Sequence, residues 1–116
     1  MKRYLLILGF TMMPVLMSPS LIYAADQAAA LDLAKKSGCL ACHSVEKKVV
    51  GPAFKDISAR YKGDSTAKEK LVAKVKTGGK GNWTEVTGGV PMPPYSPRVS
   101  DQNIEALVTF VLSLAE

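Results

Sequence analysis

The chain has 116 residues, a formal net charge of +5 and 47% apolar residues. This length allows one domain and excludes a barrel enzyme, a two-domain dehydrogenase and a kinase. The charge is modest and no long Lys/Arg run occurs, so nucleic-acid binding is not expected.

The chain begins with the pattern of a secretory signal peptide. A short basic head precedes a nearly continuous apolar run over residues 4–17, and small residues follow it. We predict a leader over residues 1–24, cleaved near Ala24, and an exported periplasmic domain over residues 25–116. An uncleaved anchor is the alternative, but the run is shorter than the roughly 20 residues of a spanning helix and proline interrupts it. Stable membrane insertion is therefore not expected.

The first predicted helix covers residues 26–37, which are rich in Ala and Leu and carry Lys near their end. Gly38 is expected to close this helix and to begin a bend, because glycine readily adopts the left-handed conformation found after helices. The bend leads directly into the next motif.

The densest chemical motif is Cys-Leu-Ala-Cys-His at residues 39–43. The pattern C-x-x-C-H is typical of c-type haem attachment: Cys39 and Cys42 add to the vinyl groups of the porphyrin, and His43 is directed at the iron. A thioredoxin-like pair would need a βαβ pattern, and a structural zinc site would need more Cys or His ligands than the chain has. A simple disulfide would leave His43 without a role. One covalent haem c is the favoured cofactor.

Two short helices are predicted after the motif. Residues 53–61 place apolar side chains at a spacing of three and four. A capping-box signature, Thr66 followed by Glu69, opens the next helix, which Gly78 closes. Five of the nine glycines then fall within residues 78–89, so a long loop is expected.

The second iron ligand is inferred by elimination. After the leader, the chain has one histidine, His43, and one methionine, Met92. Met92 lies in the run Val-Pro-Met-Pro-Pro at residues 90–94, whose prolines restrict the backbone and so reduce the entropy lost on ordering the loop. Two alternatives stay open: a methionine that only fills a gap in a rigid turn, and a lysine ligand with a lowered pKa.

The last predicted helix covers residues 101–115, with Ser100 or Asp101 as its cap. Its apolar stripe repeats at helical spacing: Ile104, Leu107, Val108, Val111 and Leu112. No strand alternation is evident. The predicted fold class is all-α, with about four helices and long ordered loops wrapped around one haem, which supplies the apolar core that a domain this small lacks.

These motifs, in this order, resemble the class I c-type cytochromes, in particular the short bacterial monohaem carriers. The resemblance covers residues 32–114. Besides the Cys-x-x-Cys-His motif, it rests on Val-Gly-Pro-Ala-Phe at 50–54, Pro-Met-Pro-Pro at 91–94 and Val-Ser-Asp at 99–101. It implies a cytochrome c fold in which the first and last helices cross, with Phe110 in the crossing.

The resemblance also implies two supporting roles. Pro52 matches a family proline whose carbonyl accepts a hydrogen bond from the ligand imidazole, here that of His43. Trp83 resembles a family tryptophan that donates a hydrogen bond to a haem propionate. Between Trp83 and Pro91 the chain has a longer connection, residues 84–90, than the usual short members of the family.

Coordination by both His43 and Met92 would leave no open iron site for a substrate, which favours a soluble, monomeric, periplasmic electron carrier over an enzyme. Lysines flank the haem motif in sequence and, if they surround the haem edge, would steer acidic redox partners: Lys35, Lys36, Lys47, Lys48 and Lys55. An ordinary solvated face is the alternative for these lysines. Two other functions stay open: a dissociable subunit of a larger oxidase, peroxidase or sulfur-oxidising complex, and a haem ligand sensor.

Overall fold

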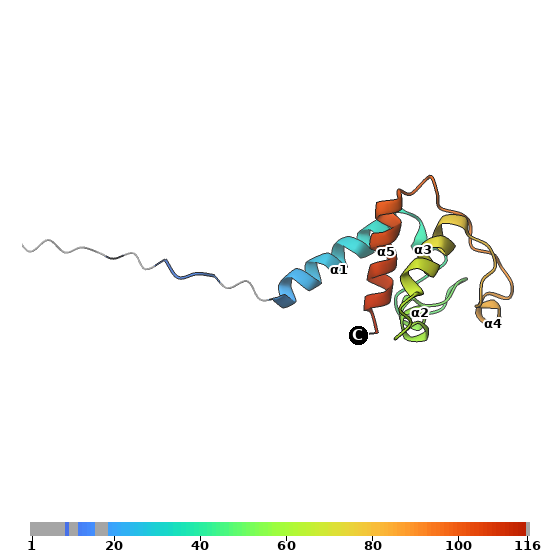
Figure 1. The fold of residues 1–116 in the computed structure, drawn as a ribbon, viewed down its shortest axis with the longest axis horizontal. Helices are drawn as coiled ribbons and strands as arrows, with labels where there is room; N and C mark the ends of the chain where they lie inside the picture. Colours follow the sequence, from blue (N-terminus) through green and yellow to red (C-terminus); the bar gives the residue numbers. More distant parts are fainter. Residues whose placement is uncertain (1–8, 10–11, 16–18, 116) are drawn as a thin grey trace, which may run out of the picture.

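Figure 1 shows the fold as a computed structural model, which describes residues 9, 12–15 and 19–115. The described residues form five α-helices and one 3-10 turn: α1 (Pro19–Lys36), η1 (Cys39–Ala41), α2 (Phe54–Arg60), α3 (Ala67–Thr77), α4 (Thr84–Thr87) and α5 (Asp101–Ser113). They form no named strand, only an isolated bridge between Gly79 and Met92. The predicted all-α class is confirmed. Most of the predicted leader lies outside the described residues.

Helix α1 begins at Pro19, earlier than the predicted start at residue 26. The prediction began the helix near the expected leader cleavage site, whereas the sequence has no helix breaker between residues 19 and 36 and a proline suits a first helical position. The predicted end is confirmed, because Gly38 takes a left-handed conformation with φ 85° and its N–H donates to the Lys35 carbonyl at 3.1 Å.

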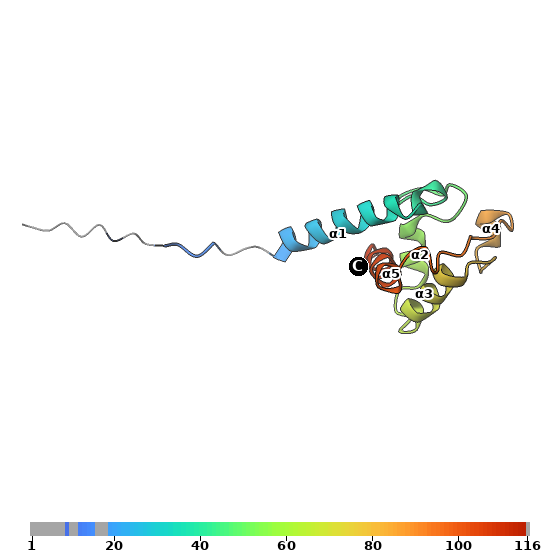
Figure 2. The ribbon, with the colours of Figure 1, turned by 90° about the horizontal axis from the view of Figure 1, so that it is seen from above.

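Helix α5 is the centre of the fold, and α1, α2 and α3 all pack against it. Figures 1 and 2 show α1 and α5 crossing, as the resemblance implied. The buried core is built mainly from α5, with additions from α1, α2 and the loop before α5: Ala34, Phe54, Tyr95, Val99, Ile104, Leu107, Val108 and Phe110. Among the described residues, no helix has both the length and the apolar character needed to cross a bilayer.

The N-termini of α3 and α5 are capped in different ways. At α5 the Ser100 hydroxyl accepts a hydrogen bond from the Asn103 N–H at 3.2 Å, so this part of the prediction is confirmed. At α3 the predicted capping box is wrong. The Thr66 hydroxyl instead donates to Asp64 Oδ1 at 2.6 Å, and the Thr66 N–H donates to the same oxygen at 2.8 Å. The carboxylate of Asp64, two residues earlier, competes successfully for the threonine.

The glycine-rich segment contains one helix that was not predicted, the four-residue α4. Gly88 ends it in a left-handed conformation with φ 63°, and the Gly88 N–H donates to the Thr84 carbonyl at 2.9 Å. A single turn carries too few residues for an apolar period to be visible in the sequence. The longer connection before Met92 is therefore ordered as a helical turn.

Candidate functional site

The motif at residues 39–43 forms one tight turn that presents both cysteines and the histidine together. The N–H groups of Cys42 and His43 both donate to the Cys39 carbonyl, at 3.2 and 3.0 Å. Both thiols are free and partly buried, and both line the same cavity. Burial raises the pKa of the Cys39 thiol above its ordinary value. The turn thus places two thiols and one imidazole at the wall of a single cavity.

The imidazole of His43 is fixed by three neighbours. Its Nδ1 lies 2.8 Å from the Pro52 carbonyl oxygen and donates to it, because a carbonyl can only accept; Nε2 is then left with its lone pair free. The Phe54 ring stacks on the imidazole, with ring centroids 5.4 Å apart. Gly51 approaches so closely that a Cβ at this position would lie 2.5 Å from His43 Cε1. Position 51 must therefore be glycine for the ring to keep this orientation.

The backbone of Met92 is bridged to the segment that follows α3. The Gly79 N–H donates to the Met92 carbonyl at 2.8 Å, and the Met92 N–H donates to the Gly79 carbonyl at 3.1 Å. Three residues later, the Tyr95 N–H donates to the Val75 carbonyl at 3.1 Å, on α3 itself. A Cβ on Gly78 would collide with the backbone of residues 92–94. The end of α3 therefore sets the position of the methionine loop.

One cavity of about 370 Å³ brings these four side chains together, since Cys39, Cys42, His43 and Met92 all line it. The rest of its wall is largely apolar and comes from α2, from several loops, and from α3 and α5, which contribute Leu71, Val75, Leu107, Val108, Phe110 and Val111. A porphyrin is a large, mostly apolar plane. Two thiols can attach a haem c covalently, and an imidazole with a free Nε2 and a thioether are the iron donors of Met/His ligation. The residues present therefore fit a covalently attached haem.

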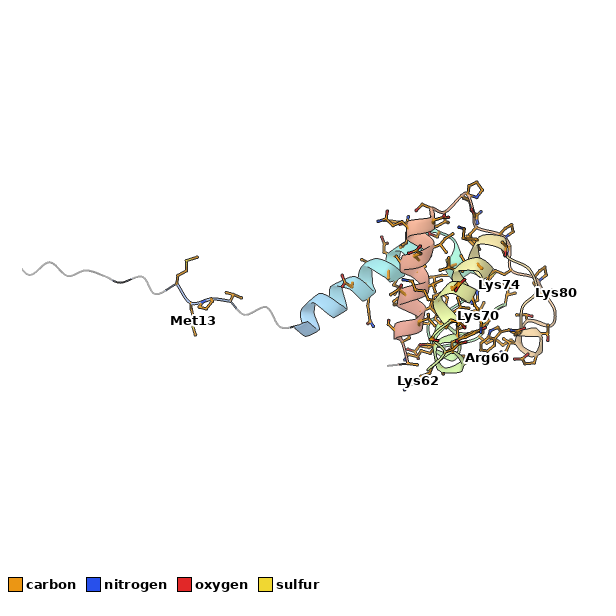
Figure 3. The ribbon with its side chains drawn as sticks, in the orientation of Figure 1. Met13, Arg60, Lys62, Lys70, Lys74 and Lys80 are labelled. Carbon is orange, nitrogen blue, oxygen red and sulfur yellow. The ribbon has the colours of Figure 1, made fainter. Side chains whose placement is uncertain are left out.

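Charged and aromatic residues complete the cavity wall. Trp83 lines it, and so do three lysines from α3 and the loop after it: Lys70, Lys74 and Lys80 (Figure 3). The lysines that flank the motif in sequence are not among the lining residues, and two of them form ion pairs instead: Lys36 with Asp32 at 2.7 Å and Lys55 with Glu46 at 2.6 Å. The three cavity lysines were missed because only the folded backbone brings α3 to the haem motif.

Residues 12–115 match the profile of the cytochrome c family. The chain is 56% identical to a cytochrome c-551 of Allochromatium vinosum over 84 residues, which cover 72% of this chain and 84% of that protein. Its fold is similar to the crystal structure of wild-type Nitrosomonas europaea cytochrome c552, with TM-score 0.65 and 49% identity over 72% of this chain and 98% of that one.

A second solved structure, the class 1 cytochrome MtoD of Sideroxydans lithotrophicus ES-1, has TM-score 0.65 and 31% identity over 77% of this chain and 96% of that one. These matches extend over most of the described helices and agree with the donor set around the cavity. The chain belongs to the cytochrome c family, the small electron carriers that hold one haem c covalently.

Proposed function

We propose that this chain is a one-electron carrier of the periplasm in which Cys39 and Cys42 would hold the haem through thioethers and His43 and Met92 would bind its iron. The observation that carries this assignment is that all four side chains line one largely apolar cavity. When bound, the haem supplies a single iron that is oxidised or reduced by one electron, and Met/His ligation gives it a higher reduction potential than His/His ligation would.

We expect the residues of the chain to keep the site nearly unchanged between the two oxidation states. The Pro52 carbonyl holds the His43 ring in one orientation and raises the basicity of its free nitrogen. The paired hydrogen bonds with Gly79 hold the backbone of Met92 in place. Because His43 and Met92 would both bind the iron, no iron site would be left for a substrate, and the protein would act as a carrier and not as an enzyme.

We assign the Trp83 indole N–H as a donor to a haem propionate. Trp83 lines the cavity together with Lys74 and Lys80, so the largely apolar wall includes polar and cationic groups. These groups are suited to the acidic edge of a porphyrin, because buried carboxylates need donors or counter-charges.

Redox proteins with acidic docking faces are the partners we assign to this carrier. The lysines at the cavity wall, and Lys47 and Lys48 in the loop before α2, would raise the encounter rate with such partners. Charge reversal at Lys80 alone, and at Lys47 and Lys48 together, should each slow reduction by an acidic partner at low salt. A rate that neither change affects, and that does not fall with added salt, would exclude electrostatic steering.

We further infer that residues 1–24 are a leader cleaved near Ala24, and that residues 25–116 act as a monomer in the periplasm. The basic head, the apolar run and the small residues at the end of the leader support this inference. Intact mass and native mass spectrometry of the exported protein test both points. A product that retains residues 1–24 or a stable dimer would contradict them.

Optical spectra of the oxidised and reduced protein, expressed in the periplasm, test the haem assignment. A Met92→Ala variant should lose the methionine–iron charge-transfer band, whereas a Val90→Ala control in the same loop should keep it. An unchanged low-spin spectrum in Met92→Ala would remove Met92 as a ligand, and a colourless folded protein would remove the haem itself. Ready carbon monoxide binding by the reduced protein would favour a ligand sensor, and copurification with an oxidoreductase would favour a dissociable subunit.

A further inference from the structure

Residues 83–90, which we call the flap, form part of the cavity wall but have little packing behind them. Trp83, Thr87 and Val90 of the flap line the cavity. In both ribbon views α4, at the centre of the flap, lies apart from the other helices (Figures 1 and 2), and its backbone is not close to that of any other described helix. The other walls are backed by the core around α5, so the flap needs a separate attachment.

Arg60 supplies such an attachment. Its guanidinium carbon lies 4.2 Å from the centroid of the Trp83 ring, which is a cation–π contact with the first residue of the flap. Its Nη1 lies 3.4 Å from Glu85 Oε1, which is an ion pair with a residue of α4. Figure 3 shows the Arg60 side chain on the side of the domain where α2 and α4 face each other. One side chain therefore holds the flap at two points.

The helix that carries Arg60 is itself firmly anchored. Arg60 is the last residue of α2, and Ser58, two positions earlier, is 1% exposed. The Ser58 hydroxyl donates to the Leu112 carbonyl at 2.8 Å and accepts from the Ala115 N–H at 2.9 Å, which ties α2 to the end of α5. Arg60 thus extends from a fixed base to a poorly supported segment. A planar guanidinium can stack on a ring and pair with a carboxylate at the same time, whereas a lysine ammonium cannot stack in this way.

We propose that Arg60 is a positioning residue that holds the flap closed next to Met92 and so keeps small external ligands from reaching the iron. The flap ends at Val90, two residues before Met92, so opening it would uncover the methionine side of the cavity. The proposal rests on the assignment of Met92 as an iron ligand. It gives the longer connection before Met92 the role of shielding the iron from small external ligands.

The test compares the haem-loaded wild type with Arg60→Gln, Arg60→Lys and Glu85→Gln, and with Lys62→Gln as a matched control for the loss of a nearby exposed cation. The first measurement is amide hydrogen exchange at Thr87 and Gly88, whose N–H groups donate within α4 to the carbonyls of Trp83 and Thr84 at 2.9 Å. The second is imidazole binding to the oxidised protein, followed by its visible spectrum.

Arg60→Gln should raise both exchange at these amides and the rate of imidazole binding by about three- to tenfold, since it removes two weak contacts at once. Arg60→Lys should restore part of the protection, and Glu85→Gln, which keeps the stacking, should have the smaller effect of about twofold. Lys62→Gln should match the wild type, and exchange at the Gly79 and Met92 amides should not change in any variant.

The proposal would be overturned if Arg60→Gln showed the same amide exchange and the same imidazole binding as Lys62→Gln. If Arg60→Gln raised amide exchange equally throughout the protein, the proposal would also be overturned, because the substitution would then lower general stability and not release the flap alone. Failure of the Met92 assignment is distinguishable, because hydrogen exchange reports the flap whichever residue ligates the iron, while the charge-transfer band reports the ligand.

Discussion

The histidine side of the cavity, residues 39–54, and the methionine side, residues 78–95, are attached to the fold by different kinds of contact. On the histidine side, the turn at Cys39, the Pro52 carbonyl and the Phe54 ring are all close in sequence to His43. Phe54 in turn packs edge-on against Phe110 of the core, with ring centroids 6.3 Å apart. This side is a compact, local unit that is backed by buried side chains.

The methionine side is held from a distance. The Tyr95 N–H donates to the Val75 carbonyl of α3, and the flap within this side is attached through Arg60 of α2. Such a region depends on two other helices being in place. The comparison indicates that the two proposed iron ligands differ in how locally they are held, and we expect the side held by distant elements to open first to external ligands.

The largest effect is expected from Gly78→Ala, on the methionine side. Gly78 has φ 66° and ψ −152°, a conformation restricted to glycine, and a Cβ there would lie 2.8 Å from Pro93 C and from Pro94 N. We expect the free energy of unfolding to fall by about 3 kcal/mol or more, because strain and a backbone clash add. Denaturant unfolding measures this loss, and the methionine charge-transfer band should weaken with it.

Gly88→Ala is the matched control, since Gly88 also has a positive φ of 63° but a Cβ there would meet no atom within 4 Å. It should cost only about 1 kcal/mol. If the two variants lost the same free energy of unfolding, backbone strain alone would explain the loss. The close approach of Gly78 to residues 92–94 would then not limit the residue at position 78.

Gly51→Ala, on the histidine side, should have the next largest effect. The added methyl group would meet the His43 ring, which has Phe54 on one face and a hydrogen bond to Pro52, so a loss of about 1–3 kcal/mol is expected. NMR signals of the His43 ring should shift, while Met92 should keep its ligation. Gly38→Ala, where a Cβ would meet no atom within 4 Å, should leave the His43 signals in place. A Gly51→Ala variant that perturbs Met92 and not His43 would contradict the separation of the two sides.

The smallest effect concerns the turn before α3, the helix to which the methionine loop is bonded. Hydrogen bonds from the Thr66 hydroxyl and N–H, and then from Lys70, lower the pKa of Asp64 to about 2. This stabilisation is present above the ordinary pKa of 3.8 and is lost as the pH falls through about 2. Asp64→Asn should therefore flatten the dependence of stability on pH in this interval. A carboxyl NMR titration that gives Asp64 its ordinary pKa would contradict the prediction.

The local parts of this site could be predicted from the sequence, and the long-range parts could not. The attachment motif, the ends of most helices and the Ser100 cap follow from neighbouring residues, whose chemistry determines their geometry. The capping box failed because Asp64, just before it, binds Thr66 more directly. The contact of Arg60 with Glu85 joins residues 25 positions apart and has no signature in either segment. The Gly51-Pro52 pair indicated a turn, but the sequence could not show that Gly51 lies against the His43 ring.

The paired hydrogen bonds between Gly79 and Met92 have a consequence for how the proposed methionine ligand would leave the iron. Because the Met92 backbone both donates to and accepts from Gly79, the proposed iron ligation would be broken by rotation of the Met92 side chain while the backbone stays in place. The displaced Met92 sulfur would remain close to the iron at a high effective concentration. Rebinding of the sulfur should therefore be faster than binding of most external ligands unless the flap opens as well.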